Sequence, residues 1–418
     1  QVGSSAASDV YKRQDSIRLA DYGTSNSGLL KTLYRSGLSY RYGSMMQTVS
    51  GIHYNFSFSD GFFESLKGNE DLQSFKNKTY LSLIRNFRRN AWMILYLFGS
   101  SPVVPKTFIT NRENFLEDLN EEDLFLEYAT CLRMSELGYM SKAQDNLYIA
   151  YNDIDEYLKD LKHALTKEHK RYGEVGVLKD GKRIQINTSI IQIENEYYSS
   201  IRPKRVTPPG ERPINILRAE GIDYVEIRAL DNNSFLPSGV DEDTSYFLEA
   251  YLIGCFFGED RKSSQDEIKE LLVNWENVVK EGRNPDLKIL KNKEKITVKD
   301  SGMKVIDSLR EVFEQMPSEM SGYVEKVMKS LNKQEEKLND ASLTPSGRIV
   351  SELQNNNKSW EELNLELAGE HSQSFKRIET DLDYLSREAK SSLEKFYELG
   401  DQQEEEFEVY LDKFVNDI

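Results

Sequence analysis

Residues 221–231 read GIDYVEIRALD, and this stretch decides the fold that we expect. Polar and apolar side chains alternate along it, which is typical of a strand with one face on a core and the other exposed. The polar face would carry Tyr224, Glu226 and Arg228, and the residues between them are apolar. The pattern therefore predicts a strand that places a carboxylate beside a guanidinium, although such pairs are also common as solvated surface ions.

A second strand is predicted over residues 46–58, MQTVSGIHYNFSF. Alternation puts Gln47, Val49, His53 and Asn55 on one face of that strand. His53 could serve a site on this face, but a lone histidine is more often a hydrogen-bonded or exposed residue than a ligand.

A third strand is predicted over residues 192–198, QIENEYY, whose shared face would hold Gln192, Glu194, Glu196 and Tyr198. Three polar faces, two of which carry carboxylates, predict a sheet with a charged concave side, where Mg²⁺ would offset carboxylates and nucleotide phosphates. The neighbouring basic segment, residues 201–213, contributes Arg202, Lys204 and Arg205. These three could hold nucleotide phosphate, and a solvated loop is an equally consistent interpretation.

Helical periodicity surrounds these strands. Apolar spacing predicts a long buried helix over residues 78–98, a second helix over 152–172, and helices throughout from residue 243 onward. Asp180 and Gly181 between two β-patterned runs predict a type I′ hairpin. That hairpin also explains a near match to a phosphate-binding loop in residues 176–183, where Arg183 replaces the required Ser or Thr. We therefore expect an α+β fold.

Composition excludes several classes of protein. The 418 residues carry a formal charge of −16, which argues against nucleic-acid binding, and no apolar stretch approaches the roughly 20 residues of a membrane helix. Two distant cysteines, Cys131 and Cys255, imply neither a disulfide framework nor a zinc site, which fits a reduced cytoplasm. Residues 335–418 hold 21 acidic and 9 basic residues, so most of the negative charge belongs to the C-terminal region.

Several stretches, in this order, resemble the proteobacterial type of glutamate-cysteine ligase. They are YGTSNSGLLKTLYRSGLSYRYG, MQTVSGIHYNFSF, RNFRRNAWMILYLFGSSP, LRMSELGY, QIENEYYSSIRPKRVTPPGE, and GIDYVEIRALD followed by PSGVDED. The resemblance runs from about residue 15 to near residue 300. It implies a glutamine-synthetase-like antiparallel active-site sheet with surrounding helices, a catalytic domain over residues 15–300, and a helical acidic region over 301–418.

The resemblance also implies roles for particular residues. His53 and Glu226 look like magnesium ligands, and Arg228 looks like the residue that holds the transferring phosphoryl group, so Glu226 and Arg228 are the catalytic candidates. The family's cysteine pocket would be lined here by Tyr34, Leu38, Gln47, Val49, Arg133, Tyr139 and Tyr198. Val49 replaces a more usual isoleucine, which should enlarge the pocket slightly.

The implied reaction uses ATP and Mg²⁺ to join the γ-carboxyl of L-glutamate to the amine of L-cysteine through a γ-glutamyl phosphate, in a cytoplasmic monomer. A related ligase with another amine acceptor is an alternative, which Tyr139 and Tyr198 would discriminate. So is an inactive domain that only binds a partner.

The front of the chain departs from the family. Residues 9–14, DVYKRQ, resemble a translated sequencing adapter, so we expect residues 1–14 to be extraneous and the natural N-terminal part to be missing. The family carries a Glu-x-Glu metal-binding segment there. Its loss would leave the metals under-coordinated, so we expect little or no activity from this chain.

Overall fold

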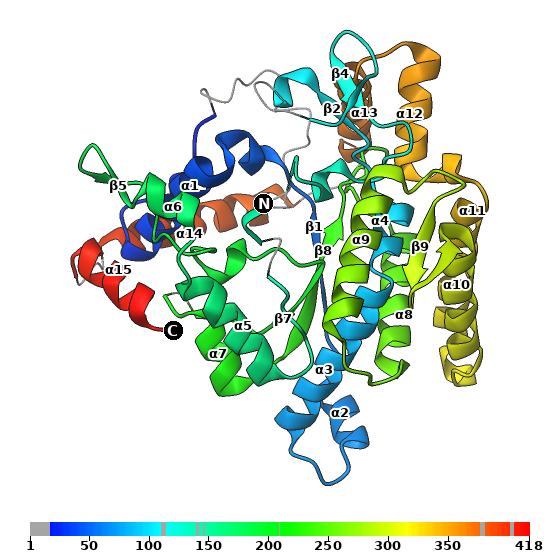
Figure 1. Ribbon diagram of the computed structural model, residues 1–418, viewed down its shortest axis with the longest axis horizontal. Coiled ribbons are helices and arrows are strands. Elements are labelled where there is room, and N and C mark those ends of the chain that lie inside the picture. The colour runs from blue at the N-terminus through cyan, green and yellow to red at the C-terminus, as the bar shows by residue number, and fades with distance from the viewer. Residues whose placement is uncertain are drawn as a thin grey trace.

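A three-stranded antiparallel sheet lies at the centre of the chain in the computed structural model (Figure 1). The structure describes residues 17–109, 114–138, 142–144, 147–208, 210–376, 381–401 and 405–418. Within them, β8 (Tyr224–Leu230) pairs on one side with β1 (Ile52–Phe56) and on the other with β7 (Ile201–Lys204). The strand predicted from GIDYVEIRALD is thus confirmed, as is the α+β class.

The register of this sheet brings polar side chains of all three strands to one face. Glu226 is the cross-strand partner of Asn55 on β1 and of Arg202 on β7. On the other face Val225 and Ile227 are completely buried in the main hydrophobic core. Alternation along β8 therefore separates a charged open face from an apolar face that packs on helices.

The helices around the sheet have the following bounds: α1 Asn26–Tyr42, α2 Asp60–Leu66, α3 Leu72–Arg89, α4 Trp92–Phe98, α5 Ile154–Thr166, α6 Lys170–Val175, α7 Pro213–Glu220, α8 Glu242–Phe257, α9 Gln265–Glu281, α10 Val298–Glu314, α11 Ser321–Asn339, α12 Pro345–Asn356, α13 Trp360–Phe375, α14 Leu382–Asp401 and α15 Phe407–Asn416. The α3 and α4 helices cover the apolar face of the sheet, and α8 packs against α3. Among the helices of the described residues, none is both long and apolar enough to cross a bilayer.

Both long helices predicted from periodicity are interrupted. The predicted helix 78–98 is divided between α3 and α4, because Asn90 leaves the helical conformation and ends α3. The predicted helix 152–172 is divided between α5 and α6. There the Lys167 carbonyl accepts from the Ile190 amide at 2.9 Å and the His169 amide donates to the Thr188 carbonyl at 2.9 Å. Those pairings with a distant segment replace helical hydrogen bonds, which periodicity cannot anticipate.

The predicted strand 46–58 is shorter than expected. Residues Ser44–Thr48 form a 3₁₀ turn, and only Ile52–Phe56 is β-structure. The Gln47 amide donates to the Arg35 carbonyl of α1 at 2.9 Å, so this turn is held against α1 rather than paired in the sheet. Gln47 and His53 therefore do not lie on one strand.

The predicted strand QIENEYY is wrong, because Glu194–Glu196 is a 3₁₀ turn. Each of its carboxylates binds a buried arginine: Glu196 Oε1 lies 3.0 Å from Arg41 Nη1, and Glu194 Oε1 lies 3.0 Å from Arg212 Nε. The arginines come from α1 and from the residue before α7. The two carboxylates thus hold neighbouring segments together instead of facing a common site.

One of the two small hairpins was predicted from the sequence, and the other was not. The hairpin predicted at Asp180 and Gly181 is confirmed between β5 (Leu178–Lys179) and β6 (Lys182–Arg183), and both turn residues have positive φ, 51° and 75°. The prediction of helices throughout from residue 243 onward missed a second hairpin, between β9 (Lys288–Lys291) and β10 (Glu294–Thr297). Its turn has positive φ at Asn292 and Lys293 and no glycine, so the usual signal is missing.

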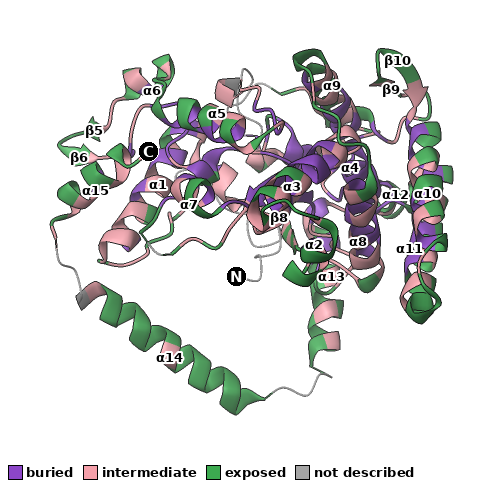
Figure 2. Cartoon of the chain, turned by 90° about the horizontal axis from the view of Figure 1, so that it is seen from below, coloured by how far each residue is buried: buried purple, intermediate pink, exposed green. Residues whose placement is uncertain are grey.

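A third small sheet and the C-terminal helices complete the structure. The strands β2 (Val103–Pro105), β4 (Asp123–Phe125) and β3 (Glu117–Asp118) pair antiparallel, and α13 packs against β2. The α10 and α11 helices pack on each other and on α8, and the main core includes residues from both sides of position 300. Figure 2 shows α14 exposed along its length, crossing from the side of α13 to that of α15.

We predict that Glu267→Gln destabilises the protein by about 1 kcal/mol near neutral pH. Glu267 lies in the first turn of α9 and receives hydrogen bonds from Arg89 (2.9 Å) and Arg261 (2.5 Å). Burial acts to raise the pKa of Glu267, but these arginines outweigh it and hold the pKa below its ordinary 4.5. A carboxylate whose pKa is lower in the folded protein than in the unfolded chain stabilises the fold at pH values above its unfolded pKa. That stabilisation is lost as the pH falls through its folded pKa. The difference in unfolding free energy from wild type, measured in urea, should therefore shrink below about pH 4.5. The exposed Glu281→Gln, at the other end of α9, is the control for removing a carboxylate from this helix.

The Glu196 carboxylate accepts hydrogen bonds from Arg41 (3.0 Å), from the Tyr42 hydroxyl (2.7 Å) and from the backbone N–H of Gln192 (2.6 Å). Glu196→Gln should lower the unfolding free energy by about 3 kcal/mol, because it leaves the buried Arg41 without its counter-charge. Denaturant titration measures this loss. A stable variant with wild-type unfolding would show that the pair is not structural.

Candidate active site

The open face of the sheet gathers an imidazole, a carboxylate and a guanidinium. His53 Nδ1 lies 3.4 Å from Glu226 Oε1, and Arg228 Nε lies 3.8 Å from Glu226 Oε2 and 3.5 Å from His53 Nε2. The Glu226 and Arg228 side chains are mostly buried, whereas His53 is half exposed. Asn55 is the cross-strand partner of Glu226, so alternation along β1 places His53 on the same face. The structure therefore joins His53 of one predicted strand to Glu226 and Arg228 of another.

Glu226 is an ionised group at neutral pH. Burial by itself would raise the pKa of Glu226, but the hydrogen bond from His53 and the charges of Lys204, His53 and Arg228 together lower it to about 2. Lys204 is the cross-strand partner of Tyr224, two residues along β8 from Glu226. Burial, Arg202 and Arg228 lower the pKa of Lys204, and Glu226 acts in the opposite direction. This face thus presents a carboxylate surrounded by cationic groups.

Arg202 and Lys204 extend the open face onto β7, but Arg205 does not. Arg202 is only 5 % exposed, donates from Nη2 to the Asn195 carbonyl at 3.1 Å, and has a buried Nε without a hydrogen-bond partner among the described residues. A buried donor without a partner is costly, and a bound anionic oxygen would satisfy it. Arg205 instead donates to the Gly221 carbonyl at 2.7 Å and to Gln73 of α3 at 3.0 Å. Its contacts lie on the side of the sheet that α3 covers.

A cavity of about 1200 Å³ opens at the end of β8. It is lined on one side by three of the predicted site residues, Val49, His53 and Arg133, and on the other by α13, including His371. His371 Nε2 lies 2.8 Å from the Ser234 carbonyl, which ties α13 to the loop after β8. The C-terminal region therefore forms a wall of the same cavity as the sheet.

The other described residues of the expected cysteine pocket are not among those that line this cavity. Tyr34 and Leu38 lie on α1, and burial together with the charge of Glu196 raises the pKa of the Tyr34 hydroxyl. The Tyr198 ring lies 5.7 Å from the Arg228 guanidinium, and Tyr198 lines a second cavity of about 350 Å³. Gln47 bonds the Arg35 carbonyl, as described above. Tyr139 lies outside the described residues.

Within the ranges that the structure describes, no group of three or more His, Cys, Asp or Glu side chains could hold a metal. His53 and Glu226 are thus the donors that the open face offers, and a bound Mg²⁺ would need further oxygen ligands from phosphate or water. Cys131 and Cys255 are both buried, and burial raises the pKa of each thiol, so neither is activated as a nucleophile.

Sequence reasoning missed two contributors to this site. Asp231 directly follows β8 and binds Arg133, with Arg133 Nε 2.5 Å from Asp231 Oδ1. Because the alternating strand pattern ends at Asp231, the sequence offered a signal that this residue lies beside the site. No local pattern indicated that α13 forms a wall of the cavity, because its contacts join segments far apart in the sequence.

Comparison with known proteins gives a consistent result. A family profile described as glutamate-cysteine ligase matches residues 4–278. The glutamate-cysteine ligase of Pseudomonas putida KT2440 is 41 % identical over 367 residues, covering 87 % of this chain and 70 % of that protein. The Pseudomonas fluorescens Pf-5 enzyme is 40 % identical over 417 residues, covering 97 % of this chain and 77 % of that protein.

Solved structures agree on the fold. The crystal structure of glutamate-cysteine ligase from Francisella tularensis in complex with AMP matches with a TM-score of 0.88 at 35 % identity, covering 97 % of this chain and 80 % of that one. A bifunctional glutathione synthetase from Pasteurella multocida matches with a TM-score of 0.59 at 21 % identity, over 81 % of this chain and 39 % of that one, which is a likeness of fold alone.

These comparisons do not support the expected N-terminal truncation. The family match begins at residue 4, inside the segment that we expected to be extraneous, and that segment lies outside the described residues. The profile, the relatives and the arrangement of the sheet agree on one conclusion. The chain belongs to the glutamate-cysteine ligase family.

Proposed function

We propose that this chain joins the γ-carboxyl of L-glutamate to the amine of L-cysteine at the expense of ATP, the first step of glutathione biosynthesis. The observation that carries the proposal is the ionised Glu226, with His53 and Arg228 within 4 Å of it, on the open face of the central sheet. A cationic surface with one carboxylate suits metal-bound phosphate.

The chemistry needs no protein nucleophile. A γ-carboxylate oxygen of glutamate attacks the γ-phosphorus of ATP, the bond to the bridging oxygen breaks, and ADP leaves. The amine of cysteine then attacks the acyl carbon of the γ-glutamyl phosphate, loses a proton, and inorganic phosphate leaves. Arg228 and Arg202 would offset charge on the transferring phosphoryl group, with Lys204 beside them. The AMP bound by the Francisella enzyme supports an adenine nucleotide as the co-substrate.

His53 and Glu226 would hold Mg²⁺. Their donor atoms are 3.4 Å apart, so each can reach one ion at a normal bond length of about 2.1 Å. The ionised carboxylate is the type of ligand that Mg²⁺ prefers. When bound, the ion neutralises phosphate charge and orients the γ-phosphoryl group.

The comparisons favour cysteine as the acceptor over another amine, and an enzyme over a pure binding module. The expectation of little or no activity receives no support, since relatives align over up to 97 % of the chain. The monomeric state and cytoplasmic location remain predictions.

Glu226→Gln should reduce kcat by about 100-fold or more and raise the Mg²⁺ concentration needed for half-maximal activity, because the charge that balances the metal is lost. ADP release, measured over a magnesium titration with glutamate and cysteine saturating, checks this. Glu220→Gln is the matched control, since Glu220 also pairs with an arginine, Arg205 at 3.2 Å, away from the open face. An unchanged magnesium dependence in Glu226→Gln would reject the metal role. Absence of γ-glutamylcysteine in the wild-type assay would reject the function itself.

A further inference from the structure

Asp231 is a buried carboxylate that three groups contact at once. It is 5 % exposed, and it accepts from Arg133 Nε at 2.5 Å, from the Ser101 hydroxyl at 2.7 Å and from the Ser100 amide at 2.7 Å. Ser100 and Ser101 lie just after α4, whereas Asp231 follows β8. A carboxylate this deeply buried is stable only with such a set of donors.

A hydrogen bond to the backbone holds the Arg133 side chain in addition to its ion pair with Asp231. Its Nη2 donates to the Leu230 carbonyl at 2.7 Å, so Asp231 and the end of β8 together fix the plane of the guanidinium. The backbone at residue 51 lies against that plane, and a β-carbon at Gly51 would be 2.5 Å from the guanidinium carbon. Only glycine lets the chain leading into β1 approach Arg133 this closely.

This assembly belongs to the wall of the large cavity, which Gly51, Arg133 and Asp231 all line together with His53. An arginine of fixed orientation at one end of a cavity is suited to a planar carboxylate ligand. The α-carboxylate of the acceptor amino acid is such a group, and the reaction leaves it unchanged.

We propose that Asp231 is a positioning residue: together with Gly51 it orients Arg133 to bind the α-carboxylate of the acceptor amino acid. The inference rests on the proposed function, because it assumes that cysteine is the acceptor. Asp231 itself does not contact the substrate. Its effect is a specificity for acceptors that carry a carboxylate.

Asp231→Asn tests this with two acceptors, cysteine and cysteamine, which lacks the carboxylate. Asparagine keeps an acceptor for the two serines but removes the charge that orients Arg133. We expect kcat/KM for cysteine to fall by about 10- to 100-fold, mainly through KM, while cysteamine changes little. Both acceptors are measured on the same preparation, so any loss of folded enzyme cancels in their ratio. Where cysteamine turns over too slowly, its inhibition constant against cysteine replaces kcat/KM.

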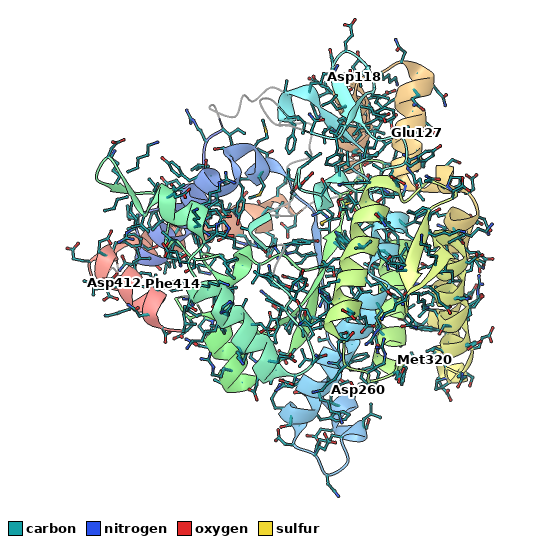
Figure 3. All side chains as sticks on the ribbon, in the orientation of Figure 1. Asp118, Glu127, Asp260, Met320, Asp412 and Phe414 are labelled. Atoms are coloured by element: carbon teal, nitrogen blue, oxygen red, sulfur yellow. The ribbon has the colours of Figure 1, made fainter. Side chains whose placement is uncertain are left out.

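Two further variants sharpen the test. Gly51→Ala should lower the same ratio by displacing the guanidinium, and Asp231→Asn should have no added effect on the ratio in an Arg133→Gln background. Asp260→Asn is the matched control, because Asp260 pairs with Arg85 far from the cavity, beside α2 and α3 (Figure 3).

A ratio that stays at the wild-type value in Asp231→Asn would overturn the inference, and so would a wild type that uses cysteamine as well as cysteine. In either case formation of γ-glutamylcysteine by the wild type would leave the proposed function standing. Absence of that product would instead reject the function and the inference with it.

Discussion

The central constraint on this protein is that β8 must bury the side chains of one face in the core and present charged side chains on the other. Val225 and Ile227 are completely buried against the helices that cover the sheet, while Glu226 and Arg228 occupy the opposite face. A one-residue change of register would exchange these faces and bury the charges in the core. The hydrophobic face therefore determines which side chains reach the site, and the chemistry depends on packing that takes no part in it.

The charges on the open face are arranged to stabilise one another. Glu226 is mostly buried, yet its pKa of about 2 shows that His53, Lys204 and Arg228 more than offset the cost of burial. Although the chain carries a net charge of −16, the cationic groups of this face outnumber its carboxylate. The local field near the site, rather than the total charge, would act on an anionic nucleotide.

Buried arginine–carboxylate pairs connect the segments around the sheet. Arg41 with Glu196, Arg212 with Glu194 and Arg133 with Asp231 each join parts of the chain that are not consecutive in structure. Arg212 also donates to the Phe414 carbonyl at 3.0 Å and lies 4.6 Å from the centre of the Phe414 ring, so the last helix is attached through the same arginine. Breaking such a pair leaves a buried charge, which makes these contacts selective for one arrangement of the segments.

The sequence alone determined the β8 strand, the alternation along it, the hairpin at Asp180 and Gly181, and the association of His53, Glu226 and Arg228 with one site. These features depend on local periodicity and turn chemistry, or on motifs that resemble a known family. Only the tertiary structure decided that QIENEYY is a turn, that Arg205 faces α3, and that α13 forms a wall of the cavity. Each of those outcomes depends on a partner distant in the chain, whether Arg41, Gln73 or the loop after β8, and a local pattern contains no information about such partners.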